Sequence, residues 1–277
     1  MDPKKIANQY KQEISLENKR DEFEKRDVLK NFFVPQEHNP RTWGVKSLDS
    51  HFKNPLPMDF VLLLGEPGIG KTSFCLHMAI ENSKKDLRVL FISLEMPAAL
   101  VQERYITTYA AIEDSQRVEI EYSTGQLEKM KECKSELENK NLSILDYTHF
   151  KNPRDFNEMK QVMKEYDMIF IDNFSLIVSR GSREVEEQGK ASEEIIGFVN
   201  EHKKTVVLLH HYAKKGRDKR GLEARGNQKL IDDLTVHASI GRDVEINDNL
   251  VYFRILKNRY RNITGVSAVN FSKGKYI

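Results

Sequence analysis

The hydrophobic pattern of this chain alternates between short apolar runs and longer, charged, amphipathic stretches. Strand-like apolar runs occupy residues 60–64, 87–94, 142–145, 168–171 and 205–209. Helical patterns occupy residues 73–79, 98 to about 140, and 184–203. Apolar strands that alternate with helices predict an α/β fold, in which a mostly parallel central sheet is covered by helices on both faces.

The two ends of the chain depart from this alternation. Short strands are expected at 242–246, 250–256 and 266–271, joined by turns at 247–249 and 263–265, which is typical of antiparallel pairing. Near the start, Ile6, Tyr10 and Ile14 recur at helical spacing in a charge-rich segment without glycine. We therefore expect a helical N-terminal arm over 1–38 and one main domain over 39–277. The arm is either a solvated helix on its own domain or a segment that docks on a neighbouring subunit.

Composition restricts the class of protein. Hydrophobic residues make up 39% of the 277 residues and charged residues 31%, which is typical of a globular chain rather than a disordered one. The apolar runs are too short to span a bilayer, the polar start does not resemble a signal peptide, and we expect no membrane partner. The two cysteines, Cys75 and Cys133, lack metal-ligand spacing, so a reducing, cytoplasmic setting is expected.

A glycine-rich loop supplies the first chemistry. It follows the apolar run 60–64, precedes a helix and fits the P-loop pattern G-x-x-x-x-G-K-S/T. Its glycines let backbone N–H groups approach phosphates, the lysine adds positive charge, and the threonine hydroxyl is placed for Mg²⁺. The loop consists of Gly65, Glu66, Pro67, Gly68, Ile69, Gly70, Lys71, Thr72 and Ser73. It predicts that ATP and Mg²⁺ are bound; the alternative is a chance glycine-rich turn.

Two carboxylates at the ends of predicted strands fit the same chemistry. Asp172 ends the run 168–171, where a metal-binding carboxylate of the Walker B type is expected; an ordinary Asp turn is the alternative. Asn173 follows it, so the general base must come from elsewhere. Glu95, after the run 87–94, is placed to activate water beside the γ-phosphate, unless it is only an acid at a helix start.

Basic residues concentrate in two later segments. Between 214 and 229 there are seven basic and two acidic residues, although the net charge of the whole chain is only +2. A basic segment without aromatic residues favours contact with the phosphates of single-stranded DNA over base stacking, and the alternative is a solvated surface loop. The seven are Lys214, Lys215, Arg217, Lys219, Arg220, Arg225 and Lys229.

The second basic segment includes Lys257 and Arg259. These two residues lie two apart on a predicted strand, so both should project from one face. Such a pair could stabilise charge on a transferring phosphate of a neighbouring subunit, or it could be a solvated edge whose charges oppose aggregation.

Seven motifs in order resemble those of the DnaB family of hexameric replicative helicases, within the RecA-like ATPases. They begin with a leading segment at 42–49, similar to T-G-F/I-x-x-L-D, and the phosphate loop. They continue with S-L-E-M at 93–96, Ile171-Asp172, and a strand that ends at His211, where the family carries a γ-phosphate sensor. The last two are 225–233, similar to R-G-S-G-x-I/L, and K-x-R at 257–259 with Thr264-Gly265.

The resemblance covers residues 41–277 and implies a function. It implies a RecA-like core, ATP hydrolysis at the interfaces of a homo-oligomer of six subunits, and movement on single-stranded DNA. It also implies catalytic roles for Glu95, Lys71, His211, Lys257 and Arg259, adds Asn227 to the DNA contacts, and suggests a primase or loader as partner. In place of the family's bulky N-terminal domain we expect only the arm at 1–38.

Three other classes remain open at this stage. A recombinase-like or KaiC-like ATPase would share the core, although the chain has no helix-hairpin-helix module and no Phe-x-x-Ala motif. An AAA+ helicase loader would need a glutamate at Asn173 and a helical C-terminal lid. A regulatory module that binds ATP without translocation differs from a helicase in strand displacement on a forked substrate.

Overall fold

The computed structural model describes residues 41–112, 122–153, 155–177, 184–211, 228–242, 249–272 and 275–276. The helical arm expected at 1–38 lies outside this part of the chain, and the domain boundary near residue 38 stays a prediction. Residues 212–227, which hold most of the basic segment, also lie outside it.

A mixed sheet organises the described residues, and its strand order is β3-β2-β4-β5-β1-β6-β7-β8-β9. The six strands from β3 to β6 in that order are parallel, whereas β7, β8 and β9 pair antiparallel. Their bounds are β1 Phe60–Gly65, β2 Val89–Ser93, β3 Leu142–Asp146, β4 Met168–Asp172, β5 Thr205–His211, β6 Val236–Arg242, β7 Leu250–Asn258, β8 Gly265–Ser272 and β9 Lys275–Tyr276. The mostly parallel α/β fold expected from the alternating pattern is confirmed.

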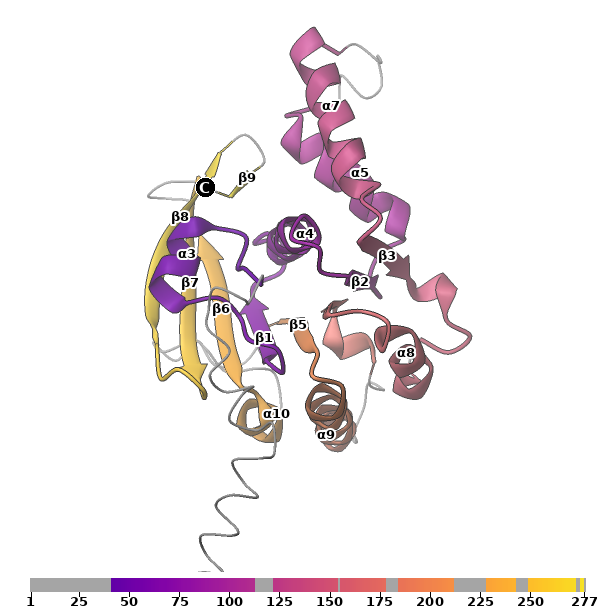
Figure 1. Cartoon of the computed structure of the whole chain (residues 1–277), viewed down its shortest axis with the longest axis vertical. Helices are drawn as coiled ribbons and strands as arrows, with labels where there is room; N and C mark the ends of the chain where they lie inside the picture. Colours follow the sequence, from indigo (N-terminus) through magenta and orange to yellow (C-terminus); the bar gives the residue numbers. More distant parts are fainter. Residues whose placement is uncertain are drawn as a thin grey trace, which may run out of the picture. The chain divides into compact units, whose positions relative to one another are not determined.

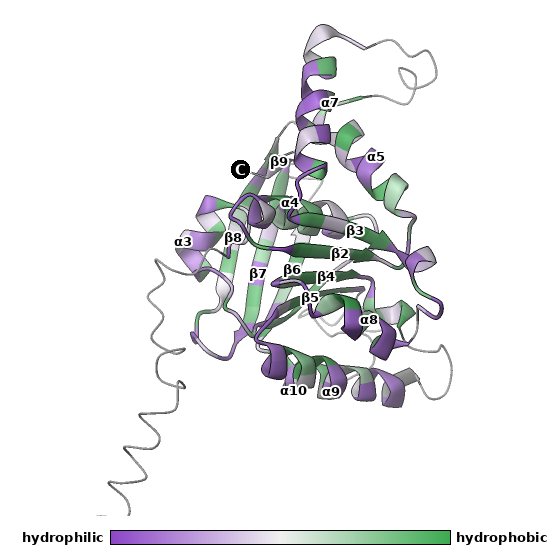
Figure 2. Cartoon of the chain, turned by 45° about the vertical axis from the view of Figure 1, so that its right-hand side comes forward, coloured by the Kyte–Doolittle hydropathy of each residue, from purple (hydrophilic) through white to green (hydrophobic). Residues whose placement is uncertain are grey.

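Helices cover both faces of the parallel strands (Figures 1 and 2). The helix α4 lies over one face, and α8, α9 and α10 lie along the other. The helices are α3 Lys46–Phe52, α4 Lys71–Ser83, α5 Ala98–Tyr109, α7 Thr124–Leu137, α8 Phe156–Met163, α9 Glu184–His202 and α10 Gln228–Asp233, with short 3₁₀ turns at Tyr147–His149 and Phe174–Leu176.

Alternation along β1 explains how one strand serves two cores. Val61 and Leu63 pack in the cluster that contains α4, whereas Leu62 and Leu64 pack in the cluster that contains α9. Successive side chains of a strand point to opposite faces, so a strand buried on both faces is apolar throughout. This is why β1 has no polar alternation in its sequence.

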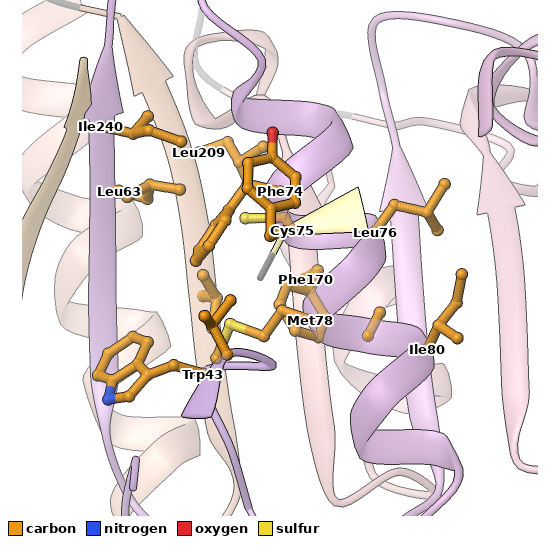
Figure 3. Packing of buried hydrophobic residues seen from close by; sticks show 14 of the residues in the cluster. Trp43, Leu63, Phe74, Cys75, Leu76, Met78, Ile80, Phe170, Leu209 and Ile240 are labelled. Atoms are coloured by element: carbon orange, nitrogen blue, oxygen red, sulfur yellow. The ribbon is translucent and has the colours of Figure 1, made fainter. Parts of the chain in front are cut away.

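The cluster under α4 joins the parallel strands to the antiparallel ones. Figure 3 shows Trp43, Phe74, Cys75 and Met78 among its members. The Phe253 ring of β7 lies 5.4 Å from Trp43 and 5.3 Å from Phe74, measured between ring centroids. The core therefore holds the phosphate-loop helix against the C-terminal strands.

Three elements differ from the sequence-based expectations. The helix expected from 98 to about 140 is divided into α5 and α7, with Ala111 at a positive φ of 51° after the first. The two helices pack side by side, and Tyr105 and Tyr109 donate hydrogen bonds to Glu136 and Glu132. The charged pattern runs through both helices and therefore hides the break.

The other two differences concern short elements. The helix α8 was missed because it is only 8 residues long; Asp155 caps it, and its apolar side chains Phe156, Met159 and Met163 are buried. The strand expected at 242–246 instead spans Val236–Arg242, while residues 243–246 lie outside the described part. Small and polar residues such as Ser239 and Gly241 within β6 obscured it. Within the described residues, no helix is both long and apolar enough to cross a membrane.

Candidate active site

Four strands bring the candidate residues to one edge of the sheet. The phosphate loop connects β1 to α4, and Gly65 at the end of β1 pairs with His211 at the end of β5. Ser93 at the end of β2 pairs with Asp172 at the end of β4, and Glu95 follows two residues later. Ligands of open parallel sheets bind at this carboxyl edge, so the register alone assembles the site.

Lys71 is buried and is held over the loop. Its ammonium group donates to the carbonyl oxygens of Gly65 and Glu66, at 2.9 and 2.8 Å, and lies 3.1 Å from Nδ1 of His211. Burial lowers the pKa of Lys71, while the charges of Asp172 and Glu95 raise it. No carboxylate among the described residues forms an ion pair with this ammonium at 4 Å or less, so an anionic ligand fits the position.

Thr72 and Asp172 form a polar pair next to the lysine. The Thr72 hydroxyl donates to Oδ2 of Asp172 at 2.6 Å. Burial raises the pKa of Asp172 to about 6; the hydrogen bond from Thr72 opposes the rise, and the charge of Glu95 adds to it. A hydroxyl and a buried carboxylate form an oxygen donor set that suits Mg²⁺, which takes one or two protein ligands beside phosphate oxygens.

Asn173 links Glu95 to His211, a contact that was not expected from the sequence. Its Nδ2 atom lies 3.1 Å from Oε2 of Glu95 and 3.2 Å from Nε2 of His211. Its Oδ1 atom accepts hydrogen bonds from the backbone N–H and the hydroxyl of Ser175. Burial, and secondarily the charge of Lys71, lowers the pKa of His211, so its imidazole is neutral at neutral pH.

The loop has the open backbone that a phosphate requires. Gly68 and Gly70 have φ angles of 76° and 100°, in the left-handed region that favours glycine. A Cβ atom on Gly70 would lie 3.2 Å from the hydroxyl of Tyr276 and 3.4 Å from Nη2 of Arg242. Both glycines therefore fit a loop that wraps a triphosphate.

Arg242 and Tyr276 stand beside the loop and were not anticipated as site residues. The Tyr276 hydroxyl donates to the Gly70 carbonyl at 3.3 Å, and burial raises its pKa to about 12. The Arg242 guanidinium lies over the Phe271 ring at 4.8 Å. A cavity of about 260 Å³, lined by Arg242, Tyr252 and Arg254 together with Glu66 and Ile69, opens next to the loop. Tyr276 lies at the end of the chain in a two-residue strand, where no local sequence signal marks it.

Lys257 and Arg259 are brought together, but at the other end of the strands. Lys257 donates to the carbonyl oxygens of Ile231 and Asp232 at 2.7 and 3.0 Å, and Arg259 also donates to Asp232. The backbone N–H of Arg259 donates to the carbonyl oxygen of Thr235, and the N–H of Thr235 donates to the carbonyl oxygen of Phe60, the first residue of β1. Phe60 and Gly65 are five residue steps apart along β1, a length of about 17 Å.

The expected DNA-binding residues are mostly outside the described part. This holds for Lys214, Lys215, Arg217, Lys219, Arg220, Arg225 and Asn227, while Lys229 lies on α10 with only its backbone described. Their contact with DNA stays a prediction.

Comparison with known proteins identifies relatives of this chain. The family model of the DnaB-like helicase C-terminal domain matches residues 42–246. A "probable plasmid replicative DNA helicase" of Chlamydia trachomatis is 27% identical over 208 residues, which cover 73% of this chain and 45% of that protein. The replicative DNA helicase DnaB of Haemophilus influenzae is 25% identical over 80% of this chain and 48% of its own length. The chain thus spans about half the length of these curated relatives.

Solved structures share the fold. A DnaB-like replicative helicase, described with its interactions with primase, superposes with a TM-score of 0.75 at 20% identity, over 91% of this chain and 65% of its own. A KaiC-like protein from Pyrococcus horikoshii gives a TM-score of 0.61 at 16% identity, over 85% of this chain and 96% of its own. The RecA-like core expected from the motifs is confirmed.

Proposed function

The chain belongs to the DnaB-like helicase C-terminal domain family, and from this premise we propose that it is an ATP-dependent DNA motor, a helicase or translocase. The observation that carries the proposal is the group formed by Lys71, Thr72, Glu95, Asp172 and His211 at one sheet edge, with a buried cation, an oxygen donor pair and an exposed carboxylate. Such a group suits phosphoryl transfer to water, where catalysis rests on positioning and electrostatics.

The residues divide into holding and reacting roles. Lys71 and the N–H groups of the loop hold the β- and γ-phosphates of ATP. Thr72 and Asp172 would hold Mg²⁺, which would neutralise negative charge on the phosphates. Glu95, whose side chain is 52% exposed, is open to solvent and orients and deprotonates the attacking water. His211 contacts Lys71 and therefore senses whether the γ-phosphate is present.

Lys257 and Arg259 complete the site of a neighbouring subunit. Their own phosphate loop lies at the opposite end of β1, so a second copy must bring its loop to them. This supports a homo-oligomer, a hexamer by family, with ATP at the interfaces. The basic segment from Lys214 to Lys229 tracks single-stranded DNA, and a primase or loader is the expected protein partner. Both cysteines, Cys75 and Cys133, are buried, which is compatible with a cytoplasmic setting.

The proposal is tested by separating binding from turnover. Glu95→Gln should keep ATP affinity but lower turnover by about 10²- to 10⁴-fold, because the water loses its base. Lys71→Ala should weaken both. If the Glu95→Gln variant hydrolyses ATP at the wild-type rate, Glu95 is not the general base. Displacement of a strand from a forked DNA by the wild type distinguishes a helicase from an ATP-binding regulatory module.

A further inference from the structure

The orientation of the Asn173 amide is fixed by its neighbours. Ser175 gives two donors, its backbone N–H and its hydroxyl, and both point at Oδ1 of Asn173. The amide nitrogen must therefore face Glu95 and His211. An amide nitrogen has two hydrogens and can donate to both neighbours. Asn173 itself is buried, with 4% of its surface exposed, so its amide depends on these protein partners for its hydrogen bonds.

Two neighbouring groups can donate to the His211 ring, but the neutral ring can accept from only one of them at a time. Lys71 lies on the Nδ1 side and the Asn173 amide nitrogen on the Nε2 side, and each of these groups can only donate to the ring. A neutral imidazole has one acceptor nitrogen and one N–H group. When Nδ1 accepts from Lys71, the N–H on Nε2 points at the Asn173 amide. When Nε2 accepts from Asn173, the N–H on Nδ1 points toward the Lys71 ammonium, which is itself a donor, so this tautomer is disfavoured while Lys71 stays at its present position.

A ligand phosphate would remove this competition. If Lys71 donates to a γ-phosphate, it leaves the Gly65 carbonyl and Nδ1 of His211. The ring can then keep its hydrogen on Nδ1, toward the phosphate that Lys71 now contacts, and accept from Asn173 at Nε2. The Asn173 amide is then held by Ser175 on one side and by His211 on the other, which fixes the hydrogen that it donates to Glu95.

We propose that Asn173 is a positioning residue that connects His211 to Glu95, so that an occupied γ-phosphate position selects the Nδ1–H tautomer of His211 and aligns the Glu95 carboxylate. The inference rests on the proposed ATPase function. It adds a residue with no part in binding phosphate or metal, and a route from the sensor to the base.

The test compares two replacements of different charge. Asn173→Leu and Asn173→Asp both remove the amide hydrogens, so a shared effect cannot come from charge. We expect kcat for ATP to fall about 100-fold in both, the usual cost of a misplaced catalytic group, while the affinity for an analogue with an uncleavable β–γ bond changes by less than about threefold. Ser175→Ala is the matched control: the backbone N–H of residue 175 still holds the amide, so kcat should fall by less than about tenfold.

A spectroscopic readout tests the connection independently of turnover. Solid-state NMR of ¹⁵N-histidine-labelled protein, assigned with a His211→Gln variant, reports the tautomer of His211. The analogue complex of the wild type should show hydrogen on Nδ1 and a bare Nε2, the ADP complex should not, and Asn173→Leu should lose this difference. The inference is overturned if both variants keep kcat within about twofold of the wild type, or if Asn173→Leu shows the same tautomer as the wild type with the analogue.

The outcomes separate this inference from the proposed function. If the wild type hydrolyses ATP, Glu95→Gln does not, and the Asn173 variants do, only the inference fails. If the wild type does not hydrolyse ATP, the proposed function fails, and the tautomer measurement still decides whether Asn173 selects the state of His211.

Discussion

Mixed oligomers offer the sharpest test of a shared site, because the structure separates its two halves. Arg259 is level with Phe60 at the amino end of β1, whereas the phosphate loop begins at Gly65 at the carboxyl end. The side chain of Arg259 is also directed to the Asp232 carbonyl at the end of α10. A subunit that lacks Glu95 should therefore be defective at the interface that contains its own phosphate loop. A subunit that lacks Arg259 should be defective at its other interface, where it faces the loop of a neighbour.

The expected magnitude follows from counting interfaces. We consider Glu95→Gln and Arg259→Ala subunits, each inactive alone, mixed in equal amounts and randomly assembled. An interface is active only where the loop of an Arg259→Ala subunit meets the arginine of a Glu95→Gln subunit. With independent interfaces, about one quarter of all interfaces meet this condition, so the rate should reach about one quarter of the wild-type rate per subunit.

The assay is phosphate release measured against the mixing ratio at constant total protein. The rate should rise from near zero, peak at the equal mixture and fall again. A control series, which mixes Glu95→Gln with the double variant Glu95→Gln/Arg259→Ala, has no active interface and should stay flat. If no mixture recovers ATP hydrolysis although light scattering confirms co-assembly, a site shared between subunits is refuted. The hydrogen bonds of Lys257 and Arg259 to the carbonyl oxygens of α10 would then be their structural role.

Two further predictions concern DNA and pH. Replacing Lys214, Lys215, Arg217 and Arg220 together by alanine should make the plot of log affinity for single-stranded DNA against log salt less steep, by up to about 0.7 for each lost phosphate contact. Fluorescence anisotropy measures this slope, and alanine at Lys129, Lys131, Lys134 and Lys140, on and near α7, is the matched control. An unchanged slope in the first variant would exclude the segment from the DNA interface. Burial, with the nearby charge of Lys257, lowers the pKa of His237 from 6.5 to about 4. Since the unfolded chain binds this proton at higher pH, the free energy of unfolding should fall as pH drops from about 6.5 to about 4, by up to ~1.4 kcal/mol per pH unit, and His237→Gln should reduce that slope in urea titrations.

The sequence contained most of the information about the parallel core and the phosphate loop. Apolar runs such as 60–64 and 168–171 are buried on both faces, so their boundaries are sharp in the sequence and close to those of β1 and β4. Asp172 directly follows the run 168–171, and the phosphate loop follows β1, so the register of β1, β5 and β4 brings both to one edge of the sheet. Local pattern therefore sufficed wherever a functional residue directly follows a buried strand.

Features that depend on contacts distant in sequence could not be predicted in this way. Tyr276 reaches Gly70 across the fold, and Arg242 joins it from a different strand. The role of Asn173 depends on which atoms of Glu95 and His211 face it, which no spacing reveals. The division into α5 and α7 was hidden because both helices have the same charged, amphipathic pattern.

The strand order has a consequence for the way in which the chain acquires its site. β1 lies between β5 and β6, so Phe60 pairs with Val206 and Val61 with Val236, partners that leave the ribosome long after β1 itself. Contacts between such distant segments form slowly, because the intervening chain must be ordered first. While the chain is being synthesised, the phosphate loop therefore exists before β5 and β6, the strands that flank β1. We expect β1 to remain exposed to solvent and to chaperones, and the loop to bind no nucleotide, until β6 has been translated.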